Sequence, residues 1–403
     1  MNIVKNNTNK LRLAFVLSSN LGQWAGMEHV MYQFWINRPN DVEIAIFQSN
    51  FNQKPRIQDE EVTSLFEGCD IRTFRGYFNK FTFLENSDTP KVLTEVLIIP
   101  LLAHILKYTL LKKLRNELSK FDVIYFFNSN REPRLLRGKK QMQIGSAHAW
   151  FPSNSSLFKR IELRLVEYGL IMHNLNYFHL FPAQFNLLET KREEKFFSIP
   201  NGVESRKFVP GEIRENAPIK FLFNARLEEC KGILLVIRAF RTLKSNEHVE
   251  LHIVGSGELS SYIKLETDKR IYLHGFVSEE ELQRIISSCD ILVYPSKCDS
   301  FSLVVLNSLS CGLHVITTME ISKNFLPLKE EGFLTITNLD PDSIANAMLE
   351  SMKNINTIRM NKSQCHNLVA ERYDWKQITK ELYEKIRELY KTYIDEHRGR
   401  EVC

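Results

Sequence analysis

The sequence lacks the features that mark secreted, disulfide-rich and nucleic-acid-binding proteins. Its seven cysteines show neither CxxC nor zinc-finger spacing, so we expect reduced thiols instead of a metal site or a disulfide framework. The N-terminal residues MNIVKNNTNK have no apolar core of the kind that a signal peptide needs. A net charge of +5 is too small to indicate nucleic-acid binding. We therefore expect a cytoplasmic protein without a nucleic-acid partner.

Long uninterrupted apolar runs are also missing. The most apolar window, Val92–Leu114, is broken by charged residues and a proline, whereas a transmembrane helix needs about 20 mostly apolar residues. Two interpretations stay open. The window is a helix packed on an N-terminal sheet, or it is an amphipathic surface that contacts an anionic membrane through basic side chains. These basic side chains are Lys107, Lys112, Lys113 and Arg115.

The clearest structural pattern runs from Asp290 to Thr318. It predicts a strand, a loop, a helix and a second strand, at residues 291–294, 295–302, 303–310 and 314–317. In a parallel α/β sheet, ligands lie at the carboxyl ends of the strands, so the polar loop should lie at a helix N-terminus. Such an end offers unpaired N–H groups and a positive dipole to a phosphate. The alternative is an ordinary loop whose helix is capped by Ser300 or Ser302.

A second strand, loop and helix precede this pattern, in FLFNARLEECKG from Phe221. Arg226 and Lys231 lie between the predicted strand and a helix at Ile233–Leu243. A pair of cations at this position is suited to clamp a pyrophosphate. Taken singly, each is more often a solvated surface charge. The two loops together therefore favour a phosphate site.

Eight segments, in order along the chain, resemble the retaining, nucleotide-sugar-dependent glycosyltransferases of family 4 (glycosyl transferases group 1). The segments are AGMEHV at Ala25, GSAHAW at Gly145, IPNGVESRKFVP at Ile199, ARLEECKG at Ala225, LHIVGSGEL at Leu251, LHGFVSEEEL at Leu273, DSFSLVVLNSLSCG at Asp299 and RYDWKQITKELYEKI at Arg372. The resemblance implies an α/β GT-B fold, in which two Rossmann-like parallel-sheet domains face each other across a cleft. It implies an acceptor domain at 1–205, a nucleotide-sugar domain at 206–374 and a helix at 375–403 that crosses back to the first domain.

The resemblance also implies roles for particular residues. His148 is expected to face the donor sugar, and Asp299 to orient its hydroxyls, so these two are the candidate catalytic residues. The nucleoside is expected beside Phe276 and Asn307. Donor phosphate and sugar oxygens are expected at Gly26, Arg226, Lys231, Ser300, Phe301, Ser302 and Leu303. Alternatives remain for two of these residues, since Gly26 is also typical of a tight turn and a single histidine such as His148 is often structural.

The sequence departs from the family at one pair of positions. The family has two glutamates where this chain has Asp299 and Asn307. Asp299 keeps the charge, whereas Asn307 keeps only an acceptor oxygen. Loss of a charge-assisted bond costs about 1–2 kcal/mol of donor binding. A weaker donor site, a changed nucleotide preference and an inactive relative are all compatible with this change.

The sequence thus predicts a retaining hexosyltransferase that moves a sugar from a nucleotide diphosphate-sugar to a glycan or lipid-linked glycan, in cell-surface polysaccharide or glycolipid synthesis. Two cations and helix N-termini can neutralise the departing diphosphate, so neither a metal nor a cofactor is expected. We expect the protein in the cytoplasm, or peripherally on the cytoplasmic face of the membrane. The alternatives are a nucleotide-sugar epimerase of the same fold and a catalytically silent binding or scaffold subunit.

Overall fold

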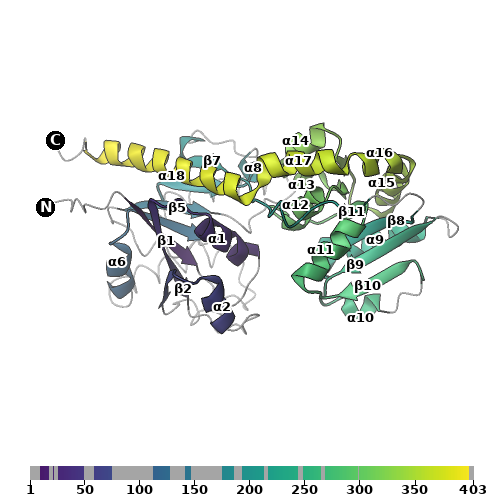
Figure 1. Ribbon diagram of the computed structural model, residues 1–403, viewed down its shortest axis with the longest axis horizontal. Helices are drawn as coiled ribbons and strands as arrows, with labels where there is room; N and C mark the ends of the chain where they lie inside the picture. The colour runs from purple at the N-terminus through teal and green to yellow at the C-terminus, as the bar shows by residue number, and fades with distance from the viewer. Residues whose placement is uncertain are drawn as a thin grey trace, which may run out of the picture. The chain divides into compact units, whose positions relative to one another are not determined.

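The computed structural model describes residues 10–17, 21, 26–49, 59–74, 112–127, 141–146, 175–185, 193–212, 217–243, 248–264, 268–297 and 299–398. The chain divides into two compact units (Figure 1). Unit 1 comprises Met1–Leu180, Leu187–Ile199 and Thr379–Cys403, and unit 2 comprises Phe181–Asn186 and Pro200–Ile378. Each unit is built around a parallel sheet of its own.

Among the described residues of unit 1, seven parallel strands form one sheet in the order β3-β2-β1-β4-β5-β6-β7. The strands are β1 (Leu11–Leu17), β2 (Val42–Ser49), β3 (Asp70–Phe74), β4 (Val123–Phe127), β5 (Met142–Ser146), β6 (Tyr177–Leu180) and β7 (Phe196–Ser198). The central strands read LRLAFVL and VIYFF. These near-continuous apolar runs are typical of a parallel sheet that is covered on both faces.

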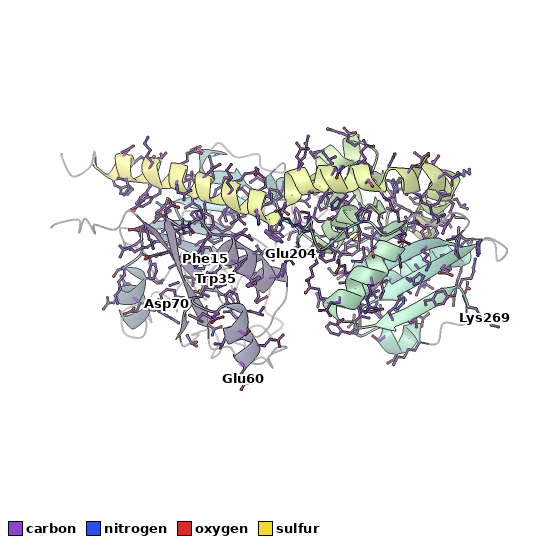
Figure 2. All side chains as sticks on the ribbon, viewed as in Figure 1. Phe15, Trp35, Glu60, Asp70, Glu204 and Lys269 are labelled. Atoms are coloured by element: carbon purple, nitrogen blue, oxygen red, sulfur yellow. The ribbon has the colours of Figure 1, made fainter. Side chains whose placement is uncertain are left out.

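Helices cover both faces of this sheet. The described helices between β1 and β4 are α1 (Gly26–Ile36), α2 (Asp59–Leu65) and α6 (Lys112–Leu118). Phe34 of α1 packs on Phe127, with 6.1 Å between ring centroids. Phe126 precedes Phe127 in β4, so its side chain points to the opposite face of the sheet. There it belongs to an apolar cluster that also contains Leu118 of α6. Phe15 is fully buried in the sheet, whereas Glu60 of α2 is exposed (Figure 2).

The described part of unit 2 contains a sheet of six parallel strands, in the order β10-β9-β8-β11-β12-β13. The strands are β8 (Ile219–Asn224), β9 (Val249–Val254), β10 (Ile271–Gly275), β11 (Ile291–Tyr294), β12 (His314–Thr317) and β13 (Leu334–Ile336). The α-helices of this unit are α8 (Pro182–Phe185), α9 (Ile233–Arg241), α10 (Ser260–Ile263), α11 (Glu279–Ser288), α12 (Leu303–Ser310), α13 (Met319–Ser322), α14 (Leu326–Glu330), α15 (Pro341–Lys353), α16 (Ile355–Met360) and α17 (Lys362–Tyr373).

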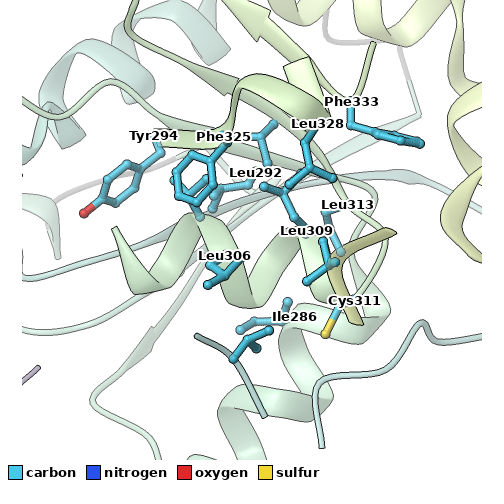
Figure 3. Close-up of a cluster of buried hydrophobic side chains, with 14 of the residues drawn as sticks. Ile286, Leu292, Tyr294, Leu306, Leu309, Cys311, Leu313, Phe325, Leu328 and Phe333 are labelled. Atoms are coloured by element: carbon cyan, nitrogen blue, oxygen red, sulfur yellow. The ribbon is translucent and has the colours of Figure 1, made fainter. Parts of the chain in front are cut away.

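Two apolar clusters cover the two faces of the second sheet. One cluster joins α9 and α15 to the face that carries Phe221 and Val293. The other joins α11, α12 and α17 to the face that carries Leu292, and includes Leu306 and Phe325 (Figure 3). Three predicted elements, β11, α12 and β12, have the bounds that the sequence indicated. The predicted pair of Rossmann-like parallel-sheet domains is confirmed.

The last helix, α18 (Trp375–Arg398), belongs to unit 1 from Thr379 onward. The Tyr383 hydroxyl donates to the Phe34 carbonyl of α1 at 2.7 Å. Arg387 forms an ion pair with Asp41 at 2.7 Å. The helix therefore returns from unit 2 to pack on unit 1, as the sequence predicts.

In the described part of the chain, no helix is both long enough and apolar enough to cross a membrane. Most of the apolar window at 92–114 lies outside the described residues, and α6 begins at Lys112 within it. Its contact with a membrane stays a prediction.

Candidate functional site

Three loops lie side by side at the carboxyl edge of the sheet in unit 2. They follow β8, β9 and β11, at residues 225–232, 255–257 and 295–302. The Leu227 N–H donates to the Ser256 carbonyl at 3.0 Å, and the Lys297 N–H donates to the Cys230 carbonyl at 2.9 Å. The first of these loops is thus hydrogen-bonded to both of the others.

Glycine permits this close packing of backbone on backbone. Gly255 has φ +127°, and a Cβ atom there would lie 1.9 Å from the Ala225 carbonyl oxygen. Gly232 has φ +82°, and its Cβ would lie 2.6 Å from the Pro295 carbonyl oxygen. Only glycine fits both the backbone angle and the space at these two positions. The glycine after β9 therefore has a packing role, whatever ligand binds near it.

A carboxylate and an ammonium meet where two of these loops touch. Lys231 ends the short 3₁₀ helix η6 (Glu229–Lys231), and its Nζ lies 2.6 Å from Asp299 Oδ1. Lys231 is 7% exposed and Asp299 is partly buried. The structure thus brings together two of the residues that the sequence singled out.

The other oxygen of Asp299 accepts two hydroxyl hydrogen bonds. Tyr294 Oη donates to Asp299 Oδ2 at 2.6 Å, and Ser296 Oγ donates to the same oxygen at 2.7 Å. Burial, with the neighbouring Asp299 charge, raises the pKa of Tyr294 well above its ordinary value, so the phenol stays protonated and acts as a donor. We name Lys231, Tyr294, Ser296 and Asp299 the carboxylate cluster.

Arg226 has a different setting from Lys231. Its side chain is 62% exposed and lies 2.5 Å from the carboxylate of Glu228. An exposed ion pair of this kind contributes little to stability and exchanges partners easily. The two cations expected to act as a pair are therefore one buried, fixed ammonium and one guanidinium at the surface.

The N-terminus of α12 follows the carboxylate cluster. Ser302 caps the helix, because its Oγ accepts the Val305 N–H at 3.3 Å. The Ser300 carbonyl accepts from the amide of Asn324 at 2.9 Å. The Phe301 ring packs between Phe181 and Phe325, 5.1 Å from each.

Packing and capping thus hold the segment before α12 in place. The sequence offered both Ser300 and Ser302 as the cap of this helix, and the structure shows that Ser302 is the cap. Because the Phe301 ring lies in the core, a ligand at the edge would meet the backbone of Phe301 instead of its side chain. Leu303, the first residue of α12, is half-buried.

The remaining predicted residues have no contact with the carboxylate cluster that the structure describes. Asn307 is half-buried within α12, and Phe276 is 87% exposed after β10, with β9 and β8 between that edge strand and β11. Gly26 is the exposed first residue of α1 in unit 1. His148 lies outside the described residues. The roles implied for these four residues stay predictions.

Sequence reasoning missed Tyr294 and Ser296. The sequence assigns Tyr294 to a β-strand and Ser296 to a polar loop, and indicates no functional role for either. The available signal was their position, since hydroxyl side chains at the carboxyl end of a central parallel strand lie where such sheets bind ligands. A buried tyrosine hydroxyl also needs a hydrogen-bond partner, and Asp299 is that partner.

The described cysteines are mostly free thiols, as expected. Cys69, Cys289, Cys311 and Cys365 are free. Cys230 differs, because it forms a disulfide. The expectation of reduced thiols is wrong at this position. The disulfide is located at η6, directly beside Lys231.

Part of unit 2 matches a known protein family. Residues 218–354 match the family model described as glycosyl transferases group 1. The matched residues include the whole carboxylate cluster and α12. The family that the sequence resembles is thereby confirmed for this part of the chain.

Curated relatives match over part of their length. An uncharacterized glycosyltransferase of Methanocaldococcus jannaschii is 28% identical over 170 residues, which are 40% of this chain and 42% of that protein. The UDP-Gal:alpha-D-GlcNAc-diphosphoundecaprenol alpha-1,3-galactosyltransferase of Escherichia coli is 29% identical over 216 residues, 49% of this chain and 54% of that protein. The chain thus spans about half the length of these relatives.

Solved structures match over nearly the whole chain. The structure of HepE from Anabaena in complex with UDP and glucose covers 93% of this chain and 99% of its own, with a TM-score of 0.66 and 15% identity. At this identity the likeness concerns the fold. Together with the two parallel sheets, it confirms the predicted GT-B class.

Proposed function

We propose that this chain, whose second unit carries a glycosyl transferases group 1 domain, is a retaining glycosyltransferase that uses a nucleotide diphosphate-sugar. The observation that carries the proposal is the ammonium of Lys231. It is buried at the carboxyl edge of a parallel sheet and held 2.6 Å from Asp299, in the segment that leads to the N-terminus of α12. A fixed cation and helix N–H groups at one edge suit a diphosphate leaving group.

The chemistry follows from the charge that develops on the donor. Breaking the bond between the sugar and the phosphate leaves a nucleoside diphosphate, whose growing negative charge must be neutralised. In the proposal, Lys231 and the first turn of α12 supply part of this neutralisation. Arg226 supplies the rest by exchanging Glu228 for a phosphate, with which a guanidinium can form two parallel hydrogen bonds. This assignment requires no metal and no further cofactor.

Retention of configuration is proposed from the family resemblance. In a front-face displacement, the leaving phosphate takes the proton of the acceptor hydroxyl as the new glycosidic bond forms. The reaction then needs no enzymic nucleophile. His148 is proposed to contact the donor sugar during this step.

The proposed acceptor is a glycan linked to a lipid. The Escherichia coli relative has a name that states transfer of galactose to GlcNAc-diphosphoundecaprenol. By analogy, we propose that this chain acts at the cytoplasmic face of a membrane, in the synthesis of a cell-surface polysaccharide or glycolipid. The apolar and basic window at 92–114 is the proposed contact with the membrane.

Binding of donor nucleotides tests the proposal. UDP, GDP, ADP and their sugar conjugates are added to the purified chain, and thermal unfolding is followed. A ligand at about 100 times its Kd adds about 2.7 kcal/mol to the free energy of unfolding. We expect one nucleotide class to stabilise the wild type and to lose this effect with Lys231→Met, which keeps most of the aliphatic stem but removes the charge. Lys353→Met, an exposed change on α15, is the matched control.

Product analysis then separates the candidate activities. A transferase forms a new glycoside when a lipid-linked acceptor is supplied, whereas an epimerase changes the donor alone. Failure of every nucleotide to bind, or equal binding by Lys231→Met, would refute the proposed donor site.

A silent binding subunit is the second candidate, and Asn307 is the observation that favours it. The family has a glutamate at this position, so a charged acceptor has been lost from α12. If the nucleotide sugar binds but stays unchanged with every acceptor, the protein is a silent binding subunit and not a transferase. We expect Asn307→Glu to tighten nucleotide binding about tenfold, in line with one charge-assisted hydrogen bond.

A further inference from the structure

We infer that Asp299 is a positioning residue that acts through Lys231, and that Tyr294 and Ser296 hold its carboxylate for this purpose. The inference rests on the proposed function and concerns the same site. It assigns to the aspartate the placing of the ammonium on the phosphate-binding edge, in addition to any contact with the donor sugar.

Both oxygens of the Asp299 carboxylate have partners from the chain itself. Oδ1 lies 2.6 Å from Lys231 Nζ, and Oδ2 accepts from Tyr294 at 2.6 Å and from Ser296 at 2.7 Å. Charge-assisted hydrogen bonds of this length are the strong ones in proteins. An ammonium has three N–H groups, so one directed at Asp299 leaves two for phosphate oxygens.

The tyrosine is anchored in the sheet. Tyr294 is the last residue of β11 and is 2% exposed. Its ring packs on Phe223 of β8 at 6.5 Å, and its carbonyl accepts from Thr317 Oγ1 of β12 at 2.8 Å. The hydroxyl is therefore fixed by contacts with both neighbouring strands, and it fixes the carboxylate in turn.

The lysine is anchored from the other side. Its own backbone is in η6, which packs on the loop after β11 through the Gly232 contact with Pro295. The neighbouring carbonyl of Cys230 accepts from Lys297 at 2.9 Å. The backbone on both sides of the pair is thus held before any ligand arrives, which is the arrangement that makes a charged group effective against a developing charge.

The two possible roles of Asp299 predict different effects on nucleotide sugars and on nucleoside diphosphates. If Asp299 only bound the transferred sugar, the groups behind it would affect nucleotide sugars and leave nucleoside diphosphates unaffected. If it places Lys231, loosening the carboxylate must also weaken nucleoside diphosphates, which carry no sugar. The effect must also disappear when Lys231 is absent.

The test is a double-mutant cycle on the dissociation constant for UDP, GDP or ADP, whichever binds the wild type. Tyr294→Phe removes one hydrogen bond to the carboxylate, and we expect the Kd to rise about three- to tenfold. In a Lys231→Met background the same change should have no further effect on the Kd. Ser296→Ala provides a second variant with the same expected coupling. Tyr383→Phe, which removes a buried tyrosine hydrogen bond in unit 1, is the matched control and should leave the Kd unchanged.

The Kd is measured on the folded fraction, so a loss of stability alone does not change it. The inference is overturned if Tyr294→Phe and Ser296→Ala bind the nucleoside diphosphate as the wild type does, or if their effects persist without Lys231. It is equally overturned if they weaken only nucleotide sugars. Absence of binding to the wild type instead refutes the proposed function, so the two failures are distinguishable.

Discussion

Arg359 forms a two-pronged ion pair with Asp290, with Nε 3.1 Å from Oδ1 and Nη2 2.9 Å from Oδ2. Asp290 directly precedes β11, the strand that ends in Tyr294, and its side chain is 7% exposed. Lys362 adds a second cation at 3.4 Å. Helices α16 and α17 are therefore tied to the amino end of the strand whose carboxyl end carries the candidate site.

Breaking this buried pair should destabilise unit 2. Arg359→Met leaves a buried carboxylate short of one cation, and we expect a loss of about 3–5 kcal/mol in the free energy of unfolding, measured with urea. The double variant Asp290→Asn/Arg359→Met should recover part of this loss. Arg284→Met removes an exposed ion pair with Glu281 and should cost less than about 1 kcal/mol. Equal costs for the two arginine changes would show that burial of the pair is unimportant.

The packing of the loops should depend on Gly255. Gly255→Ala places a Cβ 1.9 Å from the Ala225 carbonyl and forces an alanine to φ +127°. We expect it to cost about 1–3 kcal/mol more than Gly332→Ala, which has φ +82° but no atom within 4 Å of the added Cβ. Displacement of the loop that carries Arg226 should also weaken nucleotide binding. A similar Tm for the two alanine variants would contradict the close approach.

Acid should destabilise the protein through His179, which is buried, and His314, which is partly buried. Burial lowers the pKa of His179 and of His314 to about 4. Histidine in the unfolded chain has a pKa of about 6.5, so between these values the unfolded state binds more protons and stability falls as the pH falls. Each such histidine contributes up to about 1.4 kcal/mol per pH unit in this window. Urea unfolding at about pH 7 and about pH 5 measures the slope, which His314→Gln should reduce. An unchanged slope in that variant would mean that His314 is protonated in the folded state.

The disulfide at Cys230 should make nucleotide binding sensitive to reductants. Cys230 lies within η6, whose last residue is Lys231. Reduction by dithiothreitol should lower the Tm, since a disulfide contributes about 2–4 kcal/mol, and should raise the Kd for the nucleotide. Cys230→Ser should behave as the reduced wild type and show no response to the reductant. A wild type whose Kd and Tm ignore complete reduction, checked by counting free thiols, would contradict this expectation.

The local signals in the sequence predicted much of unit 2. The helix α12 could be delimited because a serine caps its start and Cys311-Gly312 is a local stop. Strands such as β11 were found because a buried parallel strand is a short apolar run. The strands β3 and β6 were missed, since DIRTF and YFHL carry charged or polar residues that hide them. Those strands are defined by their pairing with neighbouring strands of the sheet, and this pairing is not visible in the local sequence.

The sequence by itself determined the class of the protein. Strand and helix periods and caps are properties of neighbouring residues, and they predicted the loops that carry Lys231 and Asp299. The pair of parallel-sheet domains was implied by the resemblance of eight ordered segments to a known family. The tertiary structure alone decided that these two side chains touch, that Tyr294 and Ser296 hold the aspartate, and that Arg226 lies at the surface. The reason is physical. Lys231 and Asp299 follow strands that are adjacent in the sheet but 68 residues apart in the chain, and only the order of the strands brings them within 2.6 Å.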